Sequence, residues 1–132
     1  MAIMYIDAAA SMSPKLSAGG IVITGEKLDH SASIFLGEMD NHQAEWASLA
    51  FGVEEALKLK ITSLIVYTDS KIIVDSFDKN FVKNKVFKFY FDQVIGLTRH
   101  MDMFIVSYTP RKKNSRADQI AKDRLYKEKK SL

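Results

Sequence analysis

One short segment constrains the fold of this chain more than any other. Ser63–Thr68 (SLIVYT) is a continuous, largely apolar run with β-branched residues, which is typical of a strand covered on both faces. The preceding segment, Asn41–Lys60, has a different period, because Trp46, Leu49 and further apolar residues recur at helical spacing. A buried strand that follows an amphipathic helix predicts a sheet with helices packed on its faces.

The first forty residues have the pattern of short strands. Ile3–Ile6, Gly19–Thr24 and Ser31–Glu38 are apolar runs that follow one another closely, so we predict an antiparallel meander. The small and polar segment from Asp7 to Ser17, which contains Pro14, is interpreted as a turn between the first two strands.

The second half alternates between helix and strand patterns. We predict helices over Lys71–Phe77, Lys85–Arg99 and Ser115–Lys129, a strand over Met103–Tyr108, and a basic loop over Pro110–Asn114. The order of elements is therefore βββαβααβα. Three strands followed by alternation predict an α/β fold with a five-stranded mixed sheet and helices on both faces.

Size and composition narrow the classes of protein that remain. The chain has 132 residues, of which 47% are hydrophobic, which suits one compact domain over residues 1–132. The absence of cysteine excludes disulfides, zinc–thiolate sites and thiol nucleophiles. No basic segment precedes a long apolar stretch, and no apolar run reaches the length of a membrane span. We therefore expect a cytoplasmic protein that does not bind membranes.

Charge is distributed unevenly along the chain. Residues 1–60 carry four basic and eight acidic side chains, a net charge of −4, whereas residues 61–132 carry a net charge of +7. The basic residues concentrate in Lys79–Lys88 and Arg111–Lys130. This asymmetry suits a polyanion bound along one surface and cations held at another, although a solvated, lysine-rich helix explains the charge equally well.

Four acids stand at the predicted ends of elements. Asp7 and Asp69 each follow an apolar strand, and Glu45 and Asp118 each fall in the first turn of a helix. If the two strands are parallel neighbours, their carboxyl ends share the sheet edge at which α/β proteins place their sites. Clustered carboxylates repel one another, and Mg²⁺ would relieve that repulsion because hard cations prefer carboxylate oxygen.

Each acid also has a local explanation. Asp7 could be a turn residue, and Asp69 could cap the helix that follows it. Glu45 could complement a helix dipole, and Asp118 completes the acidic capping pattern Ser115-x-x-Asp118. Taken singly, these explanations are at least as good as a metal site, so the metal site depends on the four acids acting together.

Five short motifs surround the acids and the second strand. They are Tyr5-Ile6-Asp7, Gly19-Gly20-Ile21-Val22, Asn41-His42-Gln43-Ala44-Glu45, Tyr67-Thr68-Asp69-Ser70 and Asn114-Ser115-Arg116-Ala117-Asp118-Gln119-Ile120-Ala121. Together these motifs resemble the ribonuclease H family, over nearly the whole chain, in order and at family-like spacing. The most specific are the Thr-Asp-Ser after an apolar strand and the Asn-x-x-Ala-Asp-x-x-Ala of the last helix.

The resemblance implies a ribonuclease H-like fold and an endonuclease that cuts the RNA strand of RNA–DNA hybrids with two Mg²⁺ or Mn²⁺ ions. Asp7 would bridge both ions, Asp118 would help hold the ion that activates water, and Glu45 and Asp69 would help hold the other. The reaction would be an in-line displacement that leaves a 5′ phosphate and a 3′ hydroxyl. Two cations roughly 3.5–4 Å apart stabilise the entering and leaving oxygens.

The resemblance also implies contacts with the nucleic acid. An amide at Asn41 would reach the RNA strand in the minor groove, where 2′-hydroxyls are displayed, although Asn41 could equally be a helix cap. The basic segment that includes Lys83 would lie near the phosphates of the DNA strand. The residues assigned to nucleic-acid binding are Asn41, Gln43, Ser70, Lys83, Asn84 and Lys85.

The sequence departs from the family pattern at three places. Ala8 replaces the glycine that usually follows the first aspartate, and the turn after it has Ser11 and Ser13 and lacks the asparagine sometimes found there. The loop Thr109–Lys113 also lacks the histidine that many members carry. Ala8 and the missing histidine support an alternative function, a ribonuclease H-like domain that binds nucleic acid with weak or no cleavage. On either reading the expected partner is an RNA–DNA hybrid, and the expected state is a monomer.

Overall fold

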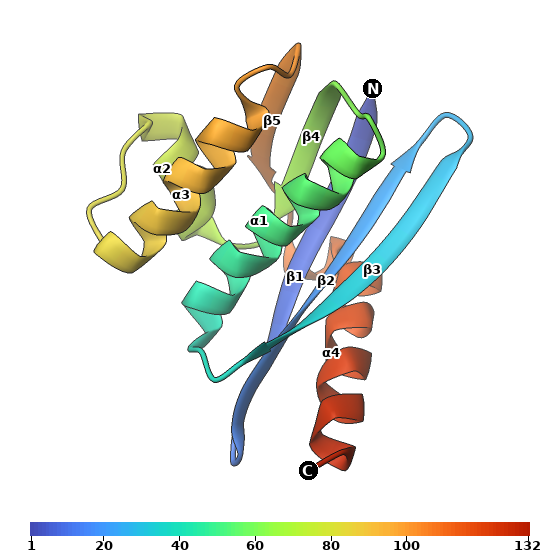
Figure 1. The fold of residues 1–132 in the computed structure, drawn as a ribbon, viewed down its shortest axis with the longest axis vertical. Helices are drawn as coiled ribbons and strands as arrows, with labels where there is room; N and C mark the ends of the chain where they lie inside the picture. The colour runs from blue at the N-terminus through green and yellow to red at the C-terminus, as the bar shows by residue number, and fades with distance from the viewer.

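Five strands form one mixed sheet in the computed structural model, which describes residues 1–132 (Figure 1). The order across the sheet is β3-β2-β1-β4-β5. The first three strands are antiparallel neighbours, and β4 runs parallel to both β1 and β5. The predicted mixed sheet and order of elements are therefore confirmed. The strands are β1 (Ala2–Met12), β2 (Lys15–Gly25), β3 (Leu28–Gly37), β4 (Ser63–Thr68) and β5 (Met103–Tyr108).

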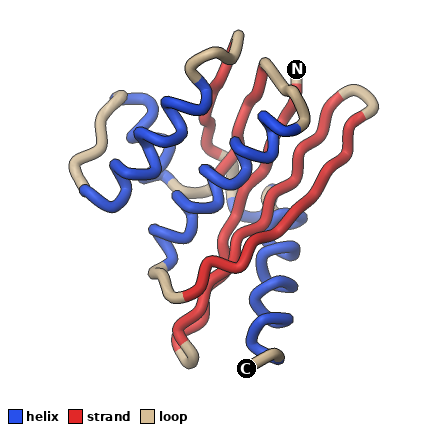
Figure 2. The backbone as a smooth tube through the Cα atoms, in the orientation of Figure 1, coloured by secondary structure: helices blue, strands red, loops and turns tan.

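Helices cover both faces of the sheet (Figure 2). Two adjacent glycines on β2 show the two layers, because a Cβ atom at Gly19 would meet Ser48 on α1, whereas a Cβ atom at Gly20 would lie 2.5 Å from the carbonyl oxygen of Ala117 on α4. None of the helices is both long and apolar enough to cross a membrane. The helices are α1 (Asn41–Lys58), α2 (Lys71–Lys79), α3 (Lys85–Thr98), the 3₁₀ helix η1 (Arg111–Lys113) and α4 (Ser115–Lys130).

The hairpin of β1 and β2 is much longer than the sequence indicates. The predicted turn from Asp7 to Ser17 is wrong, because β1 continues to Met12 and β2 begins at Lys15. Pairing continues through this segment, with Ala9 opposite Ala18. Asp7 therefore lies in the middle of a strand and not at its end.

The long hairpin is stabilised by α4. Ala9 and Ala18 from the hairpin pack against Ala121 and Leu125 of α4 in a second small core, with Leu16 beside it. Because three of these side chains are methyl groups, the helix lies close to the strands. The apolar side chains that make this segment a strand thus come from a distant part of the chain, and local pattern alone does not reveal them.

The main core lies between the sheet and α1. Met4 and Trp46 are among its largest fully buried side chains. Gly52 lets α1 approach β1, because a Cβ atom there would lie 2.7 Å from the sulfur of Met4. This close packing fixes the distance between the helix and the strand that carry two of the four acids.

The start of α1 sets the positions of Asn41 and Glu45. Asp40 is the N-cap, and its carboxylate accepts a hydrogen bond of 2.8 Å from the N–H of Gln43. Asn41 is therefore the first helical residue and leaves its amide free for other contacts. Glu45 falls in the second turn and not, as predicted, in the first.

Candidate metal centre

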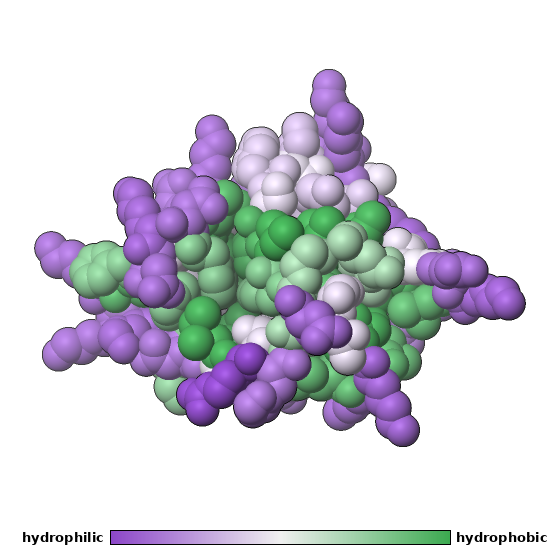
Figure 3. Space-filling view, turned by 90° about the horizontal axis from the view of Figure 1, so that it is seen from above, coloured by the Kyte–Doolittle hydropathy of each residue, from purple (hydrophilic) through white to green (hydrophobic).

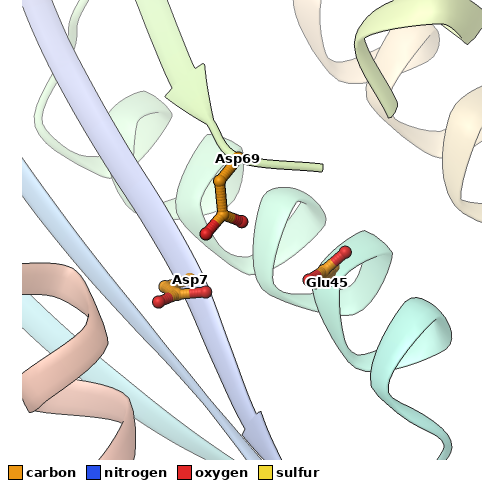
Figure 4. Close-up of side chains that lie close together, drawn as sticks. All are labelled: Asp7, Glu45 and Asp69. Carbon is orange, nitrogen blue, oxygen red and sulfur yellow. The ribbon is translucent and has the colours of Figure 1, made fainter. Parts of the chain in front are cut away.

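Three of the four predicted acids converge at one edge of the sheet. Asp7 on β1, Glu45 on α1 and Asp69 after β4 each offer a carboxylate oxygen, and these oxygens lie within 4.8 Å of one another (Figure 4). The parallel pairing of β1 and β4 ends at Tyr5 and Tyr67. Asp7 and Asp69 each come two residues later, which explains why they share this edge although Asp7 does not end its strand.

Asp118 lies beside this triad. It stands in the first turn of α4, as predicted, and one carboxylate oxygen is 2.9 Å from the Nζ of Lys122. Its negative charge is near enough to raise the pKa values of Asp7 and Asp69. Asp118 therefore acts electrostatically on Asp7 and Asp69, and a lysine holds it at the flank of the triad.

The pKa of each triad carboxyl is raised. Burial is the main cause for Asp7, whose pKa rises to about 7, and the charges of Asp69 and Asp118 add to it, while a hydrogen bond from the N–H of Ala8 opposes it. Burial also raises the pKa of Glu45. A bound cation would favour the charged forms and relieve the repulsion.

The donor set fits a hard divalent cation. Every candidate ligand of the triad is a carboxylate, and carboxylate oxygen suits Mg²⁺ or Mn²⁺, whereas zinc sites are built mainly from histidine and cysteine. A pocket of about 290 Å³ opens between the acids. It is lined by Asp7, Ala8, Asn41, Glu45, Asp69, Tyr108 and Arg111.

Two polar neighbours support the carboxylate of Glu45. The amide of Asn41 donates a hydrogen bond of 3.3 Å to its Oε1, and the hydroxyl of Ser70 also lowers the pKa of Glu45. Ser70 is buried and caps α2, accepting a bond of 3.3 Å from the N–H of Ile73. This placement favours a supporting role for Ser70, and its predicted contact with nucleic acid stays a prediction.

The local explanations for the acids do not describe the structure. Asp7 is within a strand, and Ser70, not Asp69, caps the following helix. At the start of α4, the N-cap is Asn114, which makes no side-chain capping bond. Because these acids are not needed for turns or caps, their convergence calls for another explanation.

The other residues predicted to bind nucleic acid lie outside the pocket. The amide of Gln43 donates a bond of 3.3 Å to the hydroxyl of Tyr90 and so links α1 to α3. Asn84 caps α3 through bonds of 2.9 and 3.1 Å. Lys83 and Lys85 are exposed beside it. Their contacts with nucleic acid stay predictions.

Sequence reasoning missed two residues of the pocket. Tyr108 ends β5, and Arg111 follows it in η1, where its charge opposes the rise in the pKa of Asp69. Lys71 lies over the ring of Tyr108, 5.6 Å from its centre. The sequence did contain a signal for Arg111, the basic loop Pro110–Asn114. This loop follows β5, and because β5 runs parallel to its neighbour β4, both strands end at the same edge.

A second hollow, of about 270 Å³, lies at the opposite end of the sheet. Figure 3 views the molecule from above Figure 1, where apolar side chains in the middle are bordered by hydrophilic ones. Glu26 is the only acid that lines the hollow. The hollow therefore lacks the ligands for a metal centre. Its lining residues are Met1, Ala2, Gly25, Glu26, Leu28, Ile61, Thr62 and Ser63.

Comparisons with known proteins agree with this fold. The family model described as "Reverse transcriptase-like" matches residues 5–124. A relative from Enterococcus faecalis with the name "Putative hydrolase EbsB" is 31% identical over 130 residues, which cover 94% of this chain and 93% of that protein.

Solved structures show the same architecture. RNase H1 from the halophilic archaeon Halobacterium salinarum NRC-1 has a TM-score of 0.87 at 22% identity, covering 96% of this chain and 98% of that one. LC11-RNase H1, solved in complex with an RNA/DNA hybrid, has a TM-score of 0.84 at 27% identity, covering 93% and 95%. These likenesses confirm the fold that the motifs predict.

Proposed function

The chain belongs to the reverse transcriptase-like family and is a hydrolase of the ribonuclease H type, and from this premise we propose that it hydrolyses the RNA strand of RNA–DNA hybrids. One observation carries the proposal: Asp7, Glu45 and Asp69 bring their oxygens within 4.8 Å of one another. Burying like charges together is costly unless cations compensate them. The hybrid bound by LC11-RNase H1 supports this substrate.

In this proposal the four acids hold two divalent cations, Mg²⁺ or Mn²⁺. Asp7 has the central position, Glu45 and Asp69 serve one ion, and Asp118 serves the other. The ions would stabilise charge on the scissile phosphate and lower the pKa of the attacking water. An in-line displacement at that phosphate gives a 5′ phosphate and a 3′ hydroxyl.

Neighbouring polar residues position these groups and the substrate. Asn41 and Ser70 hold the carboxylate of Glu45 by hydrogen bonds. Arg111 lines the pocket on an exposed turn, and its guanidinium is suited to a phosphate oxygen. It occupies the basic loop in which many family members carry a histidine, and so it supplies positive charge there without a titrating imidazole.

Two further parts of the proposal rest on sequence alone. We propose that the protein works as a monomer and that it is cytoplasmic. Gel filtration with light scattering tests the first, and cell fractionation tests the second.

Cleavage assays test the proposed activity. Labelled RNA–DNA hybrid, single-stranded RNA and duplex DNA are incubated with Mg²⁺, Mn²⁺ or EDTA, and the ends of the products are identified. We expect cleavage of the hybrid's RNA strand only, with 5′-phosphate ends and no cleavage in EDTA. Tight hybrid binding without cleavage in either metal would instead support the alternative, a ribonuclease H-like binding domain.

A further inference from the structure

The C-terminal helix continues away from the metal centre along one side of the molecule. Asp118 stands in its first turn, and α4 then runs beside the hairpin of β1 and β2 as far as Lys130 (Figure 1). Ala121 and Leu125 anchor this course against the hairpin. The helix is therefore a fixed extension of the site and not a free end.

One side of α4 carries basic and aromatic side chains in line with Asp118. An α-helix turns about 100° per residue, which places Lys122 about 40°, Tyr126 about 80° and Lys129 about 20° from Asp118 around the axis. We name these three residues the α4 stripe. By the same geometry Lys127 lies about 180° from Asp118, on the opposite side of the helix.

The residues of the α4 stripe are accessible. Tyr126 is 62% exposed, and the side chain of Lys122 is 55% exposed. Lys129 is exposed as well. Among the lysines of α4 only Lys122 forms an ion pair, and its partner is Asp118 itself. Lys130 lies over the ring of Tyr126, 4.9 Å from its centre, and adds charge to the same side.

We propose that the α4 stripe binds the sugar–phosphate backbone of the duplex whose scissile phosphate lies at the metal centre. This inference rests on the proposed function and extends it to a second contact region. Lys122 and Lys129 bind phosphate oxygens beyond the cleavage point, and Tyr126 packs on the backbone between them. When cations occupy the oxygens of Asp118, Lys122 is released from its ion pair for this contact.

The dimensions fit a duplex. Asp118 and Lys129 are eleven residues apart, which is about 16 Å of helix axis. One strand of a duplex presents a phosphate roughly every 3.4 Å along its axis, so the distance from Asp118 to the end of the α4 stripe spans about five nucleotides. Continuity with the metal centre favours the bound nucleic acid over an acidic protein, because the duplex already has a phosphate at Asp118. The contact is to the backbone, so it carries no sequence preference.

Binding measurements on hybrids of two lengths test this proposal. The short hybrid covers the metal centre alone, and the long one extends past it by at least about five base pairs. Affinity is measured by fluorescence anisotropy with Mg²⁺ in an Asp69→Asn background, in which turnover is slow. Lys129→Ala and Tyr126→Ala are compared with Lys127→Ala, which removes the same charge from the same helical turn on the opposite side.

We expect the long hybrid to bind more tightly than the short one, and Lys129→Ala and Tyr126→Ala to reduce that difference. Lys129→Ala should also lower the slope of log affinity against log salt by about 1, whereas Lys127→Ala should leave it unchanged. Equal effects of Lys129→Ala and Lys127→Ala, with hybrid binding intact, would overturn the proposed contact of the α4 stripe and leave the proposed function standing. If the protein without any substitution neither binds nor cleaves any hybrid, both the proposed function and the contact of the α4 stripe are wrong.

Discussion

The side-chain amide of Asn114 donates a hydrogen bond of 2.6 Å to the carbonyl oxygen of Ile6. This bond ties the residue before α4 to the residue before Asp7. Asn114 is fully buried, with 1% exposure, and no cap hydrogen bond competes for its side chain. The bond therefore sets the position of the helix that carries Asp118 relative to the strand that carries Asp7.

Asn114→Ala should lower the free energy of unfolding by about 1–3 kcal/mol, because it leaves the buried carbonyl of Ile6 without a donor. It should also weaken Mg²⁺ binding, because Asp118 is no longer held beside Asp7. Chemical denaturation and calorimetric titration measure the two effects. Ser115→Ala is the control, since Ser115 is exposed and makes no capping bond; equal losses in both variants would contradict the account.

Gly20→Ala should displace α4. A Cβ atom at Gly20 would lie 2.5 Å from the carbonyl oxygen of Ala117 and 2.7 Å from the amide nitrogen of Ala121, and backbone atoms cannot move aside as a side chain can. We expect a loss of about 1–3 kcal/mol of stability together with reduced cleavage. Gly96→Ala is the control, because nothing lies within 4 Å of its Cβ position, and alanine in a helix should stabilise by about 0.5–1 kcal/mol. Equal stability and equal cleavage in the two variants would contradict a close contact between Gly20 and the backbone of α4.

Stability without metal should fall as the pH rises from about 4 to about 7. Asp7 has an ordinary pKa of 3.8 and a raised pKa of about 7 in the folded protein. Between these values the folded chain holds a proton that the unfolded chain has released, so the free energy of unfolding decreases with pH, and Asp7 alone contributes at most about 1.4 kcal/mol per unit. Denaturation in EDTA across this range measures the effect.

Asp7→Asn should flatten that pH dependence and stabilise the metal-free protein above pH 7. The raised pKa values of Glu45 and Asp69 act in the same direction, so part of the slope should remain. Asp78→Asn removes a charge from an exposed position on α2 and serves as the control. An Asp7→Asn variant with the full original slope would show that Asp7 is not the titrating group.

Added Mg²⁺ should stabilise the protein more at high pH than at low pH, because protons compete with the cation for the carboxylates. At a hundred times the dissociation constant the gain is about 2.7 kcal/mol. Asp69→Asn should reduce this gain at a fixed Mg²⁺ concentration, while Asp78→Asn should keep it. Thermal unfolding with and without Mg²⁺ measures the difference, and equal gains in the two variants would exclude the triad as the binding site.

Arg111→Ala should weaken hybrid binding by about tenfold or more, the expected cost of one charge-assisted hydrogen bond to a phosphate. Arg111→Lys should restore part of the affinity, because it keeps the charge but not the planar fork. Lys112→Ala, a neighbour that does not line the pocket, should have the smaller effect. An Arg111→Ala variant that binds as tightly as Lys112→Ala would exclude the phosphate contact.

Elements with strong periodicity could be predicted from the sequence. The limits of β4 and β5 were correct, and α1 was correct to within two residues at its end, because their apolar residues follow the strand or helix period. Asp7 and Asp69 could be placed together because parallel strands end at one edge. Placing the two acids together required only that their strands be parallel neighbours in the sheet.

The long hairpin and Arg111 could not be predicted in the same way. Ala8 to Ala10 are too small to show an alternating pattern, and the strand is held there by its pairing with β2 and by α4, which packs against Ala9. Arg111 enters the pocket because β5 lies next to β4, which the local sequence does not encode. In both cases the missing information is tertiary, since the residue that decides the outcome lies far along the chain.

Metal-dependent cleavage tests the central claim most directly. Single-turnover cleavage of one RNA–DNA hybrid is measured in Mg²⁺ and in Mn²⁺ for the unaltered protein, Asp69→Asn and Asp78→Asn. We predict that Asp69→Asn cuts the RNA strand at least about a hundredfold more slowly, which corresponds to about 3 kcal/mol of lost transition-state stabilisation, while Asp78→Asn cuts at the original rate. Cleavage that survives Asp69→Asn or EDTA at the original rate would contradict the assignment of the carboxylates as a catalytic metal centre.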